Sequence, residues 1–288
     1  MLKYRAISGV ILGSGVVLAV LFCPLFGALL MFLVLSAVAQ VEFYALVEKS
    51  GIAVYRWVGV IGGWMVLLGM FAAGTGVGGE AAGMLALVVL GLVCMVIFVR
   101  QFPQKHNDRP VQTVGVTLLG VAYVPLLLGF TMLLAIGPGT PGLMSRLTPE
   151  GRSAIMFLIL VVKAADIGAY FAGRAFGRVK LFPRISPGKT WEGLGGGCAV
   201  AIVVGIIAVR LMDGSVGGVR LNALVVACLA CALTLVGVVG DIFESLVKRA
   251  ALQKDSSDMI PGMGGLLDVL DSLLFTGPVL YAFLYVLC

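Results

Sequence analysis

Nine stretches of mostly apolar residues alternate with short polar segments along the chain. A helix of about 20 apolar residues crosses the hydrocarbon layer of a bilayer, and a short or partly buried span needs somewhat fewer. The predicted spans are 6–22, 25–41, 53–73, 81–100, 112–135, 152–173, 191–210, 222–245 and 266–287. The first two share one apolar run, which we divide at Pro24 because proline interrupts a helix interior; one kinked helix, and hence eight spans, is the alternative.

The composition agrees with this pattern. Of the 288 residues, 60% are hydrophobic and 12% are charged, and the mean hydropathy is +1.12, whereas soluble domains are about half apolar and a quarter charged. The 40 glycines suit the same class, because small residues let membrane helices approach closely, and they permit a homodimer. We predict an all-α, polytopic integral membrane protein with a single membrane domain over residues 1–288.

The distribution of charge predicts an orientation. The net charge is +6, and most of the 20 Lys and Arg residues lie at the N-terminus and in the loops after the second, fourth, sixth and eighth spans. The other side holds only Arg146, Arg152, Arg210 and Arg220, while Lys163 lies within a span. Because cytoplasmic loops are enriched in Lys and Arg, we predict a protein of the cytoplasmic (inner) membrane with its C-terminus outside. Basic residues confined to such short loops do not indicate nucleic-acid binding.

A single histidine, His106, and six cysteines limit the metal chemistry of the chain. Even the C-x-x-C pair of Cys228 and Cys231 lies in an apolar run without a second such pair, so we interpret the cysteines as small buried apolar residues. A multi-histidine metal site is excluded.

Two predicted spans carry ionisable residues on one helical face, which costs several kcal/mol unless the groups are paired or line a wet cavity. In the sixth span, Lys163, Asp166 and Tyr170 are spaced i, i+3, i+7. They indicate either an internal Lys163–Asp166 ion pair or the wall of a substrate cavity, and the sequence favours neither. In the eighth span, Asp241 and Glu244 lie deeper than the cations that end the helix, so anchoring of the helix end does not explain them. A functional role is favoured there.

The turn IPGMGG, residues 260–265, precedes Asp268 and Asp271, which are spaced i, i+3 at the start of the ninth span. Two carboxylates at this place complement the helix dipole, but by only a fraction of a kcal/mol. Oxygen ligands without His or Cys suit Mg²⁺, which is typically held by one or two carboxylates together with substrate phosphates. The acids of the eighth and ninth spans therefore predict a magnesium site and leave a second metal ion open.

The segment RISPGKTWEGLGGG, residues 184–197, opens the seventh span. We predict that Ser186–Thr190 forms a compact turn whose cation, hydroxyl and N–H groups suit a phosphate, although Walker A spacing is absent. Phosphate-binding cations and metal-binding acids thus share one membrane face, without a histidine base or a Ser/His/Asp triad. This favours phosphoryl or nucleotidyl transfer to a lipid in a cytoplasm-facing polar cavity, because such reactions depend on metal ions, positioning and charge neutralisation.

The segment SLVKRAALQKDSSDMIPGMGGLLDVLDS, residues 245–272, resembles the C-terminal signature of the phosphatidate cytidylyltransferases, also called CDP-diacylglycerol synthases. That signature runs S-x-x-K-R-x4-K-D and, after a turn, P-G-H-G-G-x-x-D-R-x-D. The matching positions are Ser245, Lys248, Arg249, Lys254, Asp255, Pro261, Gly262, Gly264, Gly265, Asp268 and Asp271. DIGAYFAGRAFGR and ISPGKTWEG resemble two further family segments, and the N-terminal MLKYR followed by paired apolar spans is similar too. The resemblance therefore covers the whole chain and is most specific over 163–272.

The resemblance implies transfer of CMP from CTP to phosphatidic acid, which gives CDP-diacylglycerol and pyrophosphate. Residues 1–150 then supply N-terminal helices, and residues 151–288 supply the catalytic helices and loops. The expected metal ligands are Asp241, Asp268 and Asp271. The expected catalytic residues are Lys248, Arg249, Lys254 and Asp255. The expected substrate-binding residues are Ser186, Lys189, Thr190, Lys163, Asp166, Gly264 and Gly265.

Two positions depart from the family pattern: Met263 stands in place of His, and Val269 in place of Arg. A phosphate monoester is already ionised near neutral pH, so as a nucleophile it needs no histidine base. The phosphate contact of the missing arginine can come from Lys248, Arg249 or Lys254.

Other functions fit parts of this pattern. An ion-coupled secondary transporter would use buried ion pairs, but such transporters need polar access from both faces and often show repeated halves, whereas the charges here gather on one face. Another CTP-dependent lipid transferase or kinase, such as a polyprenol or dolichol kinase relative, fits less well because of the K-R-x4-K-D spacing. The sequence itself does not identify the acceptor lipid.

Overall fold

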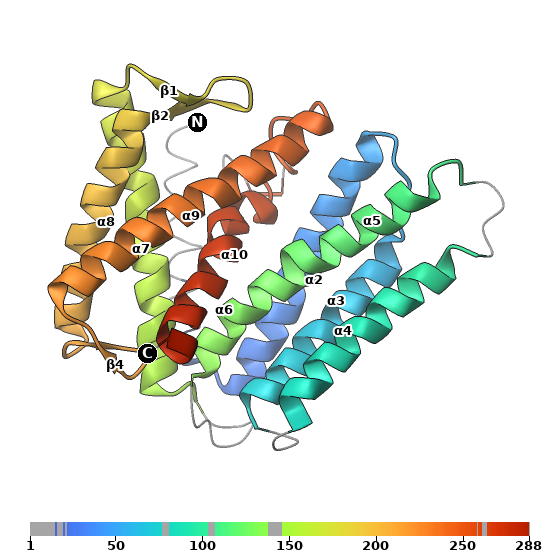
Figure 1. The fold of residues 1–288 in the computed structure, drawn as a ribbon, viewed down its shortest axis with the longest axis horizontal. Coiled ribbons are helices and arrows are strands. Elements are labelled where there is room, and N and C mark those ends of the chain that lie inside the picture. The colour runs from blue at the N-terminus through green and yellow to red at the C-terminus, as the bar shows by residue number, and fades with distance from the viewer. Residues whose placement is uncertain are drawn as a thin grey trace.

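The computed structural model describes residues 22–76, 81–102, 107–137, 146–257, 259–260 and 264–287, together with positions 15 and 20. Most of these residues are helical (Figure 1). The helices are α2 (Leu25–Lys49), α3 (Arg56–Gly74), α4 (Ala81–Arg100), α5 (Pro110–Val121), η1 (Ala122–Leu126), α6 (Leu127–Ile136), α7 (Pro149–Phe176), α8 (Trp191–Leu211), α9 (Ala223–Ala250), α10 (Leu266–Ala282) and η2 (Phe283–Leu287). The strands are β1 (Lys180–Phe182), β2 (Ser186–Thr190), β3 (Ser215–Val216) and β4 (Val219–Arg220).

Within the described residues, seven helical segments are long and apolar enough to cross a membrane. These segments are Leu25–Lys49, Arg56–Gly74, Pro110–Ile136, Pro149–Phe176, Trp191–Leu211, Ala223–Ala250 and Leu266–Val286. Helix α4 adds a shorter apolar stretch, Met84–Arg100. The predicted class of a helical integral membrane protein is therefore confirmed, and eight of the predicted spans fall on helices. The first predicted span, 6–22, lies almost wholly outside the described residues, so the count of nine stays a prediction.

Several helices continue past the apolar run that predicted them. Helix α2 extends to Lys49, beyond the predicted end at residue 41, and α9 extends to Ala250, beyond residue 245. Hydropathy marks only the part of a helix that faces lipid or core, whereas the backbone hydrogen bonds continue into polar turns. These extra turns keep Glu42 and Lys248 on rigid helical backbone.

Helix α10 joins two groups of helices. Figure 1 shows it running between α9 on one side and α6 on the other. Its Leu267, Leu270 and Leu274 are buried in an apolar core with α2–α6, while Leu280 is buried in a second core with α7, α8 and α9. Residues on α10 are therefore held from both sides of the bundle.

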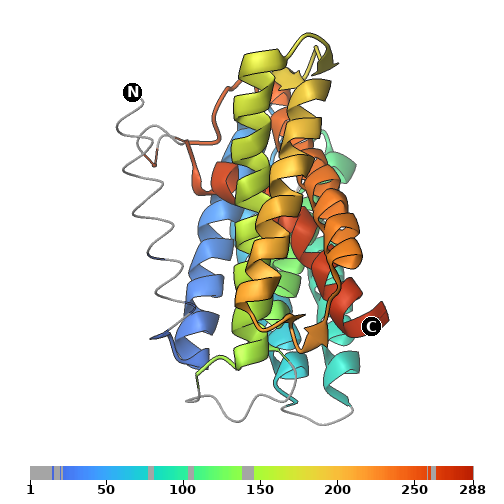
Figure 2. The same cartoon turned by 90° about the vertical axis from the view of Figure 1, so that its left-hand side faces the viewer.

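Helices α7 and α8 pack closely side by side and face the viewer in Figure 2. The contact depends on glycine: a Cβ at Gly196 would lie 2.1 Å from the Ala172 Cβ, and one at Gly168 would lie 2.7 Å from Val200. These glycines are used inside the chain, as small residues at membrane helix contacts commonly are. They give no support to the predicted homodimer, which stays a prediction.

The compact turn predicted for Ser186–Thr190 is wrong, because these residues form strand β2. It pairs antiparallel with β1, with Lys180 opposite Thr190 and Phe182 opposite Ser186, and the turn lies at residues 183–185. A residue before proline is biased towards extended backbone, which explains why Ser186, preceding Pro187, lies in a strand. The β1–β2 hairpin lies at the opposite end of the bundle from the C-terminus (Figures 1 and 2).

Candidate active site

A polar cavity of about 590 Å³ opens between α7, α8, α9, α10 and the β1–β2 hairpin. Its lining contains eight of the predicted site residues: Lys163, Asp166, Ser186, Lys189, Thr190, Asp241, Asp268 and Asp271. The helices and the hairpin thus bring together residues that are more than 100 positions apart in the sequence. Tyr170, which shares the polar face of α7 with Lys163 and Asp166, also lines the cavity.

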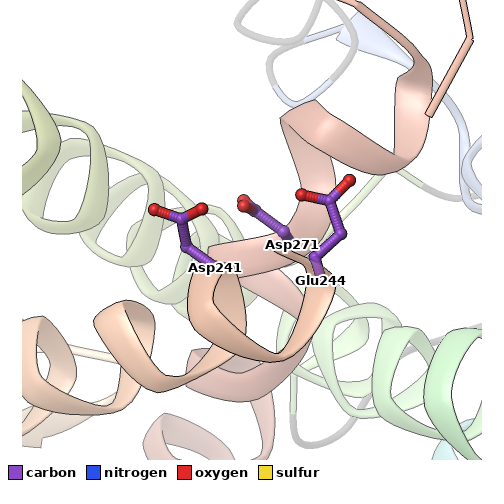
Figure 3. A group of neighbouring side chains, drawn as sticks. All are labelled: Asp241, Glu244 and Asp271. Carbon is purple, nitrogen blue, oxygen red and sulfur yellow. The ribbon is translucent and has the colours of Figure 1, made fainter. Parts of the chain in front are cut away.

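Three carboxylates form a tight group in and beside this cavity. Oxygen atoms of Asp241, Glu244 and Asp271 all lie within 4.8 Å of one another. Figure 3 shows the Asp271 carboxylate, from α10, between those of Asp241 and Glu244 on α9. Glu244 and Asp271 are buried, and within the described structure the Oε1 atom of Glu244 accepts no hydrogen bond. An unpartnered buried oxygen beside two further carboxylates is a donor set that fits a hard divalent cation such as Mg²⁺.

Asp268 makes different contacts from these three acids. Its Oδ1 accepts from the Lys248 ammonium at 2.6 Å, and its Oδ2 accepts from the backbone N–H groups of Ser256 at 2.9 Å and Gly265 at 2.7 Å. The Ser256 hydroxyl also donates to Oδ2. Asp268 therefore closes the first turn of α10, as an acid three residues after the N-cap does in a capping box.

The three lysines of the site are paired with acids. Lys189, from β2, forms an ion pair with Asp241, and its ammonium also donates to the Val238 carbonyl at 3.4 Å. Lys163 lies 3.5 Å from Asp166 and donates to the Val269 carbonyl of α10 at 3.2 Å. The two residues form an ion pair and also line the polar cavity, while the role of this cavity in binding substrate stays a prediction.

Lys248 is buried between two carboxylates. Its ammonium lies 2.6 Å from Glu244 Oε2 and 2.6 Å from Asp268 Oδ1. Among the described residues in and beside the cavity, the carboxylates outnumber the ammonium groups. The carboxylates are Asp166, Asp241, Glu244, Asp268 and Asp271, and the ammonium groups are Lys163, Lys189 and Lys248. The excess of negative charge favours a bound cation.

The remaining predicted residues do not line the cavity. Arg249 is exposed, and its Nε donates to the Ile185 carbonyl in the hairpin turn at 3.5 Å. Lys254 and Asp255 are exposed in the segment that follows α9. Gly264 has a φ of +93° and exchanges two backbone hydrogen bonds with Ile260, so its glycine is explained by the backbone conformation.

Thr190 has a structural function at the hairpin. It is the N-cap of α8, where its side chain accepts a hydrogen bond from the Gly193 N–H at 3.0 Å. Its hydroxyl hydrogen stays available for a phosphate oxygen, because the hydroxyl acts as acceptor in this bond.

The sequence matches the profile of the cytidylyltransferase family over residues 3–287. The chain belongs to this family. It is 42% identical to the phosphatidate cytidylyltransferase of Haemophilus influenzae over 139 residues, 48% of each chain, and 44% identical to that of Pseudomonas aeruginosa over 138 residues, 48% of this chain and 49% of the relative. These matches span about half the length of the curated relatives. The phosphatidate cytidylyltransferase of Bacillus subtilis is 27% identical over 97% of this chain and 96% of the relative.

Membership of the cytidylyltransferase family confirms the resemblance found in the signature segment. Two acids of the site were not predicted: Glu244 was not among the expected metal ligands, and no role was expected for Glu42 on α2. Glu42 is buried, and it accepts hydrogen bonds from the backbone N–H groups of Leu266 and Leu267 at the start of α10. The second span was predicted to end at residue 41, so this acid lay just outside it and was given no role. The available signal was an acid followed by further apolar residues, FYALV, before the next charges.

Proposed function

We propose that this cytidylyltransferase-family protein is a phosphatidate cytidylyltransferase, which transfers CMP from CTP to phosphatidic acid and releases pyrophosphate. The observation that carries the proposal is the acid group of Asp241, Glu244 and Asp271 beside lysines in a polar cavity between apolar helices. Such a cavity suits a reaction between a nucleotide from water and a phosphate from the membrane. The names of the curated relatives give independent support.

In the proposed reaction, a phosphate oxygen of phosphatidic acid attacks the α-phosphorus of CTP. A new phosphorus–oxygen bond forms, the bond from the α-phosphorus to the oxygen shared with the β-phosphate breaks, and pyrophosphate leaves with that electron pair. The second pKa of a phosphate monoester is about 6, so the attacking oxygen carries no proton near neutral pH. No histidine base is therefore required, which agrees with Met263 at the family histidine position. Met263 itself lies outside the described residues.

We assign the metal ligands to Asp241, Glu244 and Asp271, because their oxygens converge and Glu244 Oε1 accepts no hydrogen bond among the described residues. When bound there, Mg²⁺ would neutralise charge on the phosphates of CTP and on the leaving pyrophosphate. The proposal assigns one metal ion and allows a second. Asp268 is proposed to act differently from the sequence-based expectation: it holds Lys248 and the first turn of α10.

The cations are proposed to bind phosphate in two places. Lys189 and Lys163 line the cavity and neutralise the reacting phosphates, with Ser186, Thr190 and Asp166 completing the polar wall. Arg249 and Lys254 are exposed beside the cavity, where they meet the anionic nucleotide as it arrives from water. Asp255, exposed next to Lys254, orients that lysine.

The cavity is proposed to face the cytoplasm of the inner membrane, with the C-terminus outside. The positive-inside bias supports this orientation, as does the position of the β1–β2 hairpin at the opposite end of the bundle from the C-terminus (Figure 1). A membrane-impermeant maleimide should label a cysteine placed at Arg184 only in inside-out vesicles, and one at the C-terminus only in right-side-out vesicles. A variant with its native cysteines replaced serves as background. Labelling of both positions from the same side would contradict the orientation.

The function is tested by pyrophosphate release from the purified protein with CTP, phosphatidic acid and Mg²⁺. Release should require all three components, stop when EDTA is added and resume with excess Mg²⁺. Asp271→Asn and Glu244→Gln should lower the rate by more than about 100-fold. The matched control is Asp213→Asn, because Asp213 is exposed outside the cavity and its φ of 54° is one that asparagine readily adopts.

Each alternative predicts a different result in that assay. A lipid kinase would consume CTP without releasing pyrophosphate, and a cytidylyltransferase with another acceptor would be inactive with phosphatidic acid. A transporter would release no pyrophosphate with any lipid. Any of these results from folded protein would contradict the proposed reaction.

A further inference from the structure

Glu42 joins the N-terminal helices to the start of α10. Its Oε2 accepts from the Leu267 N–H at 2.7 Å and its Oε1 from the Leu266 N–H at 3.1 Å. The Ser257 hydroxyl donates to Oε1 at 2.6 Å. The Ser256 hydroxyl lies 3.4 Å from Oε2, but its single hydrogen is donated to the nearer Asp268 Oδ2. The side chain is buried, with the residue 5% exposed. Three donors, all more than 200 residues away in sequence, thus converge on one carboxylate.

These contacts supply what the α10 N-terminus lacks locally. The first N–H groups of a helix have no partner within the helix, and the residue at the N-cap usually provides one. The N-cap here is Gly265, which has no side chain. Asp268 binds the Gly265 N–H, and Glu42 of α2 binds the next two N–H groups. Glu42 therefore acts as a helix cap provided by another helix, and its negative charge suits the positive end of the helix dipole.

Gly265 permits this arrangement. A Cβ at this position would lie 2.0 Å from the Ser256 hydroxyl oxygen and 2.6 Å from Glu42 Oε2. The space next to the glycine is thus filled by the chain itself. This close approach gives a structural reason for the glycine, and the expected part of Gly265 in substrate binding stays a prediction.

The contacts of Glu42 lead directly to the acids of the cavity. The Ser256 hydroxyl reaches both Glu42 and Asp268, and Asp268 binds Lys248, which binds Glu244. Asp271 follows Asp268 by three residues on α10. The position of the first turn of α10 therefore determines where Asp271 lies relative to Asp241 and Glu244 on α9.

We propose that Glu42 is a positioning residue for nucleotidyl transfer: it fixes the first turn of α10 against α2 and thereby sets Asp271 against the acids of α9. The proposal rests on the proposed function. It assigns to the N-terminal helices a direct part in shaping the site, through a residue that does not touch the substrate.

The test compares Glu42→Gln with Glu48→Gln in the purified full-length protein. Glutamine keeps the size of Glu42, but its amide offers one acceptor oxygen to the three donors that face the carboxylate. Glu48 is the matched control because it is an exposed glutamate on the same helix. We expect Glu42→Gln to lower kcat by about 10- to 100-fold and to raise the Mg²⁺ concentration for half-maximal rate. KM for phosphatidic acid should stay within about twofold of wild type, because Glu42 does not line the cavity.

A purely structural role predicts a different result, namely less folded protein with an unchanged kcat per folded molecule and an unchanged Mg²⁺ requirement. That result would overturn the proposal. If Glu42→Gln does not fold, Ser257→Ala removes one donor at 2.6 Å and should raise the Mg²⁺ requirement in the same direction. Wild-type Mg²⁺ dependence in Ser257→Ala would then overturn it.

Amide hydrogen exchange separates this proposal from the proposed function, because it needs no activity. The amides of Leu266 and Leu267 should exchange faster in Glu42→Gln than in wild type, while those in the middle of α2 keep their protection. Unchanged protection at these two amides would overturn the positioning role. Faster exchange in a protein that releases no pyrophosphate would contradict the proposed reaction and leave the helix contact established.

Discussion

Replacing Lys248 by methionine should be strongly destabilising. The ammonium of Lys248 lies 2.6 Å from both Glu244 and Asp268, and the residue is only 8% exposed. Methionine fills a similar volume but leaves both carboxylates without their cation. Removing one partner of a buried ion pair typically costs about 3–5 kcal/mol.

The structure gives a second route to the same magnitude. Two oxygens that are both 2.6 Å from one nitrogen are at most about 5 Å apart. Two unit negative charges at about 5 Å repel by roughly 3 kcal/mol at an effective dielectric constant of about 20. Glu244→Gln in the Lys248→Met background removes one of these charges, so the double variant should recover most of that repulsion.

Thermal unfolding in detergent measures the effect. At roughly 2–4 °C per kcal/mol, Lys248→Met should melt about 6–20 °C below wild type, and the double variant several degrees higher than Lys248→Met alone. Lys49→Met is the control, because Lys49 is an exposed lysine at the end of α2. A Lys248→Met protein that melts within 2 °C of wild type, or a double variant no more stable than the single one, would refute this reasoning.

Three further predictions follow from other parts of the molecule. Gly196→Ala should lower the melting temperature, because its Cβ would lie 2.1 Å from Ala172 and overpacking costs about 1–3 kcal/mol; Gly195→Ala, where nothing lies within 4 Å, should have little effect. Tyr44→Phe should cost about 1 kcal/mol in thermal unfolding without changing pyrophosphate release, because only the bond to the Thr117 carbonyl at 2.9 Å and the contact with Gln40 are lost. Met263→His should change the initial rate of pyrophosphate release by far less than the about 100-fold that a general base contributes; a gain of that size would contradict attack by an ionised phosphate.

The membrane helices could be predicted because the physical constraint on them is local. A backbone within a bilayer must satisfy its hydrogen bonds internally, so an apolar run of about 20 residues is compelled to be helical. The predicted span 222–245 accordingly lies within α9, Ala223–Ala250, apart from its first residue, which is the N-cap Asn222. The signature segment could also be recognised from the sequence, because its residues are contiguous and end in two acids on the first turns of α10.

The separate roles of Asp268, Asp271 and Glu244 could not be predicted from the sequence. Asp268 and Asp271 are three residues apart, so on a helix their side chains point about 60° apart. That angle is enough for Asp268 to turn towards Lys248 while Asp271 turns towards α9, where Glu244 completes the group of acids. Spacing alone therefore favoured Asp268 as a ligand, whereas the packing of α9 against α10 favours Glu244.

Contacts between distant segments could not be predicted either, because the sequence around one residue does not identify a partner elsewhere in the chain. Glu42 is separated from Leu266 by 224 residues, and nothing in the local pattern around residue 42 names its partner. The β1–β2 hairpin was missed because Pro and Gly at positions 187 and 188 indicate a turn, while pairing with β1 makes them part of a strand. In both cases the deciding partner lies elsewhere in the chain.

The ion pair of Lys189 and Asp241 connects phosphate binding with metal binding in the proposed site. Each charge is compensated by the other in this structure, so neither is left unpaired in a cavity between apolar helices. On the proposed function, Lys189 exchanges Asp241 for a phosphate oxygen of the substrate. Asp241 then becomes free to bind the metal ion together with Glu244 and Asp271, so each charge exchanges one partner for another. Lys189→Met should therefore weaken CTP binding and also disturb the Mg²⁺ requirement, whereas a lysine that served phosphate alone would change only the former. Measuring the CTP affinity and the Mg²⁺ dependence of the rate on the same preparation distinguishes the two cases.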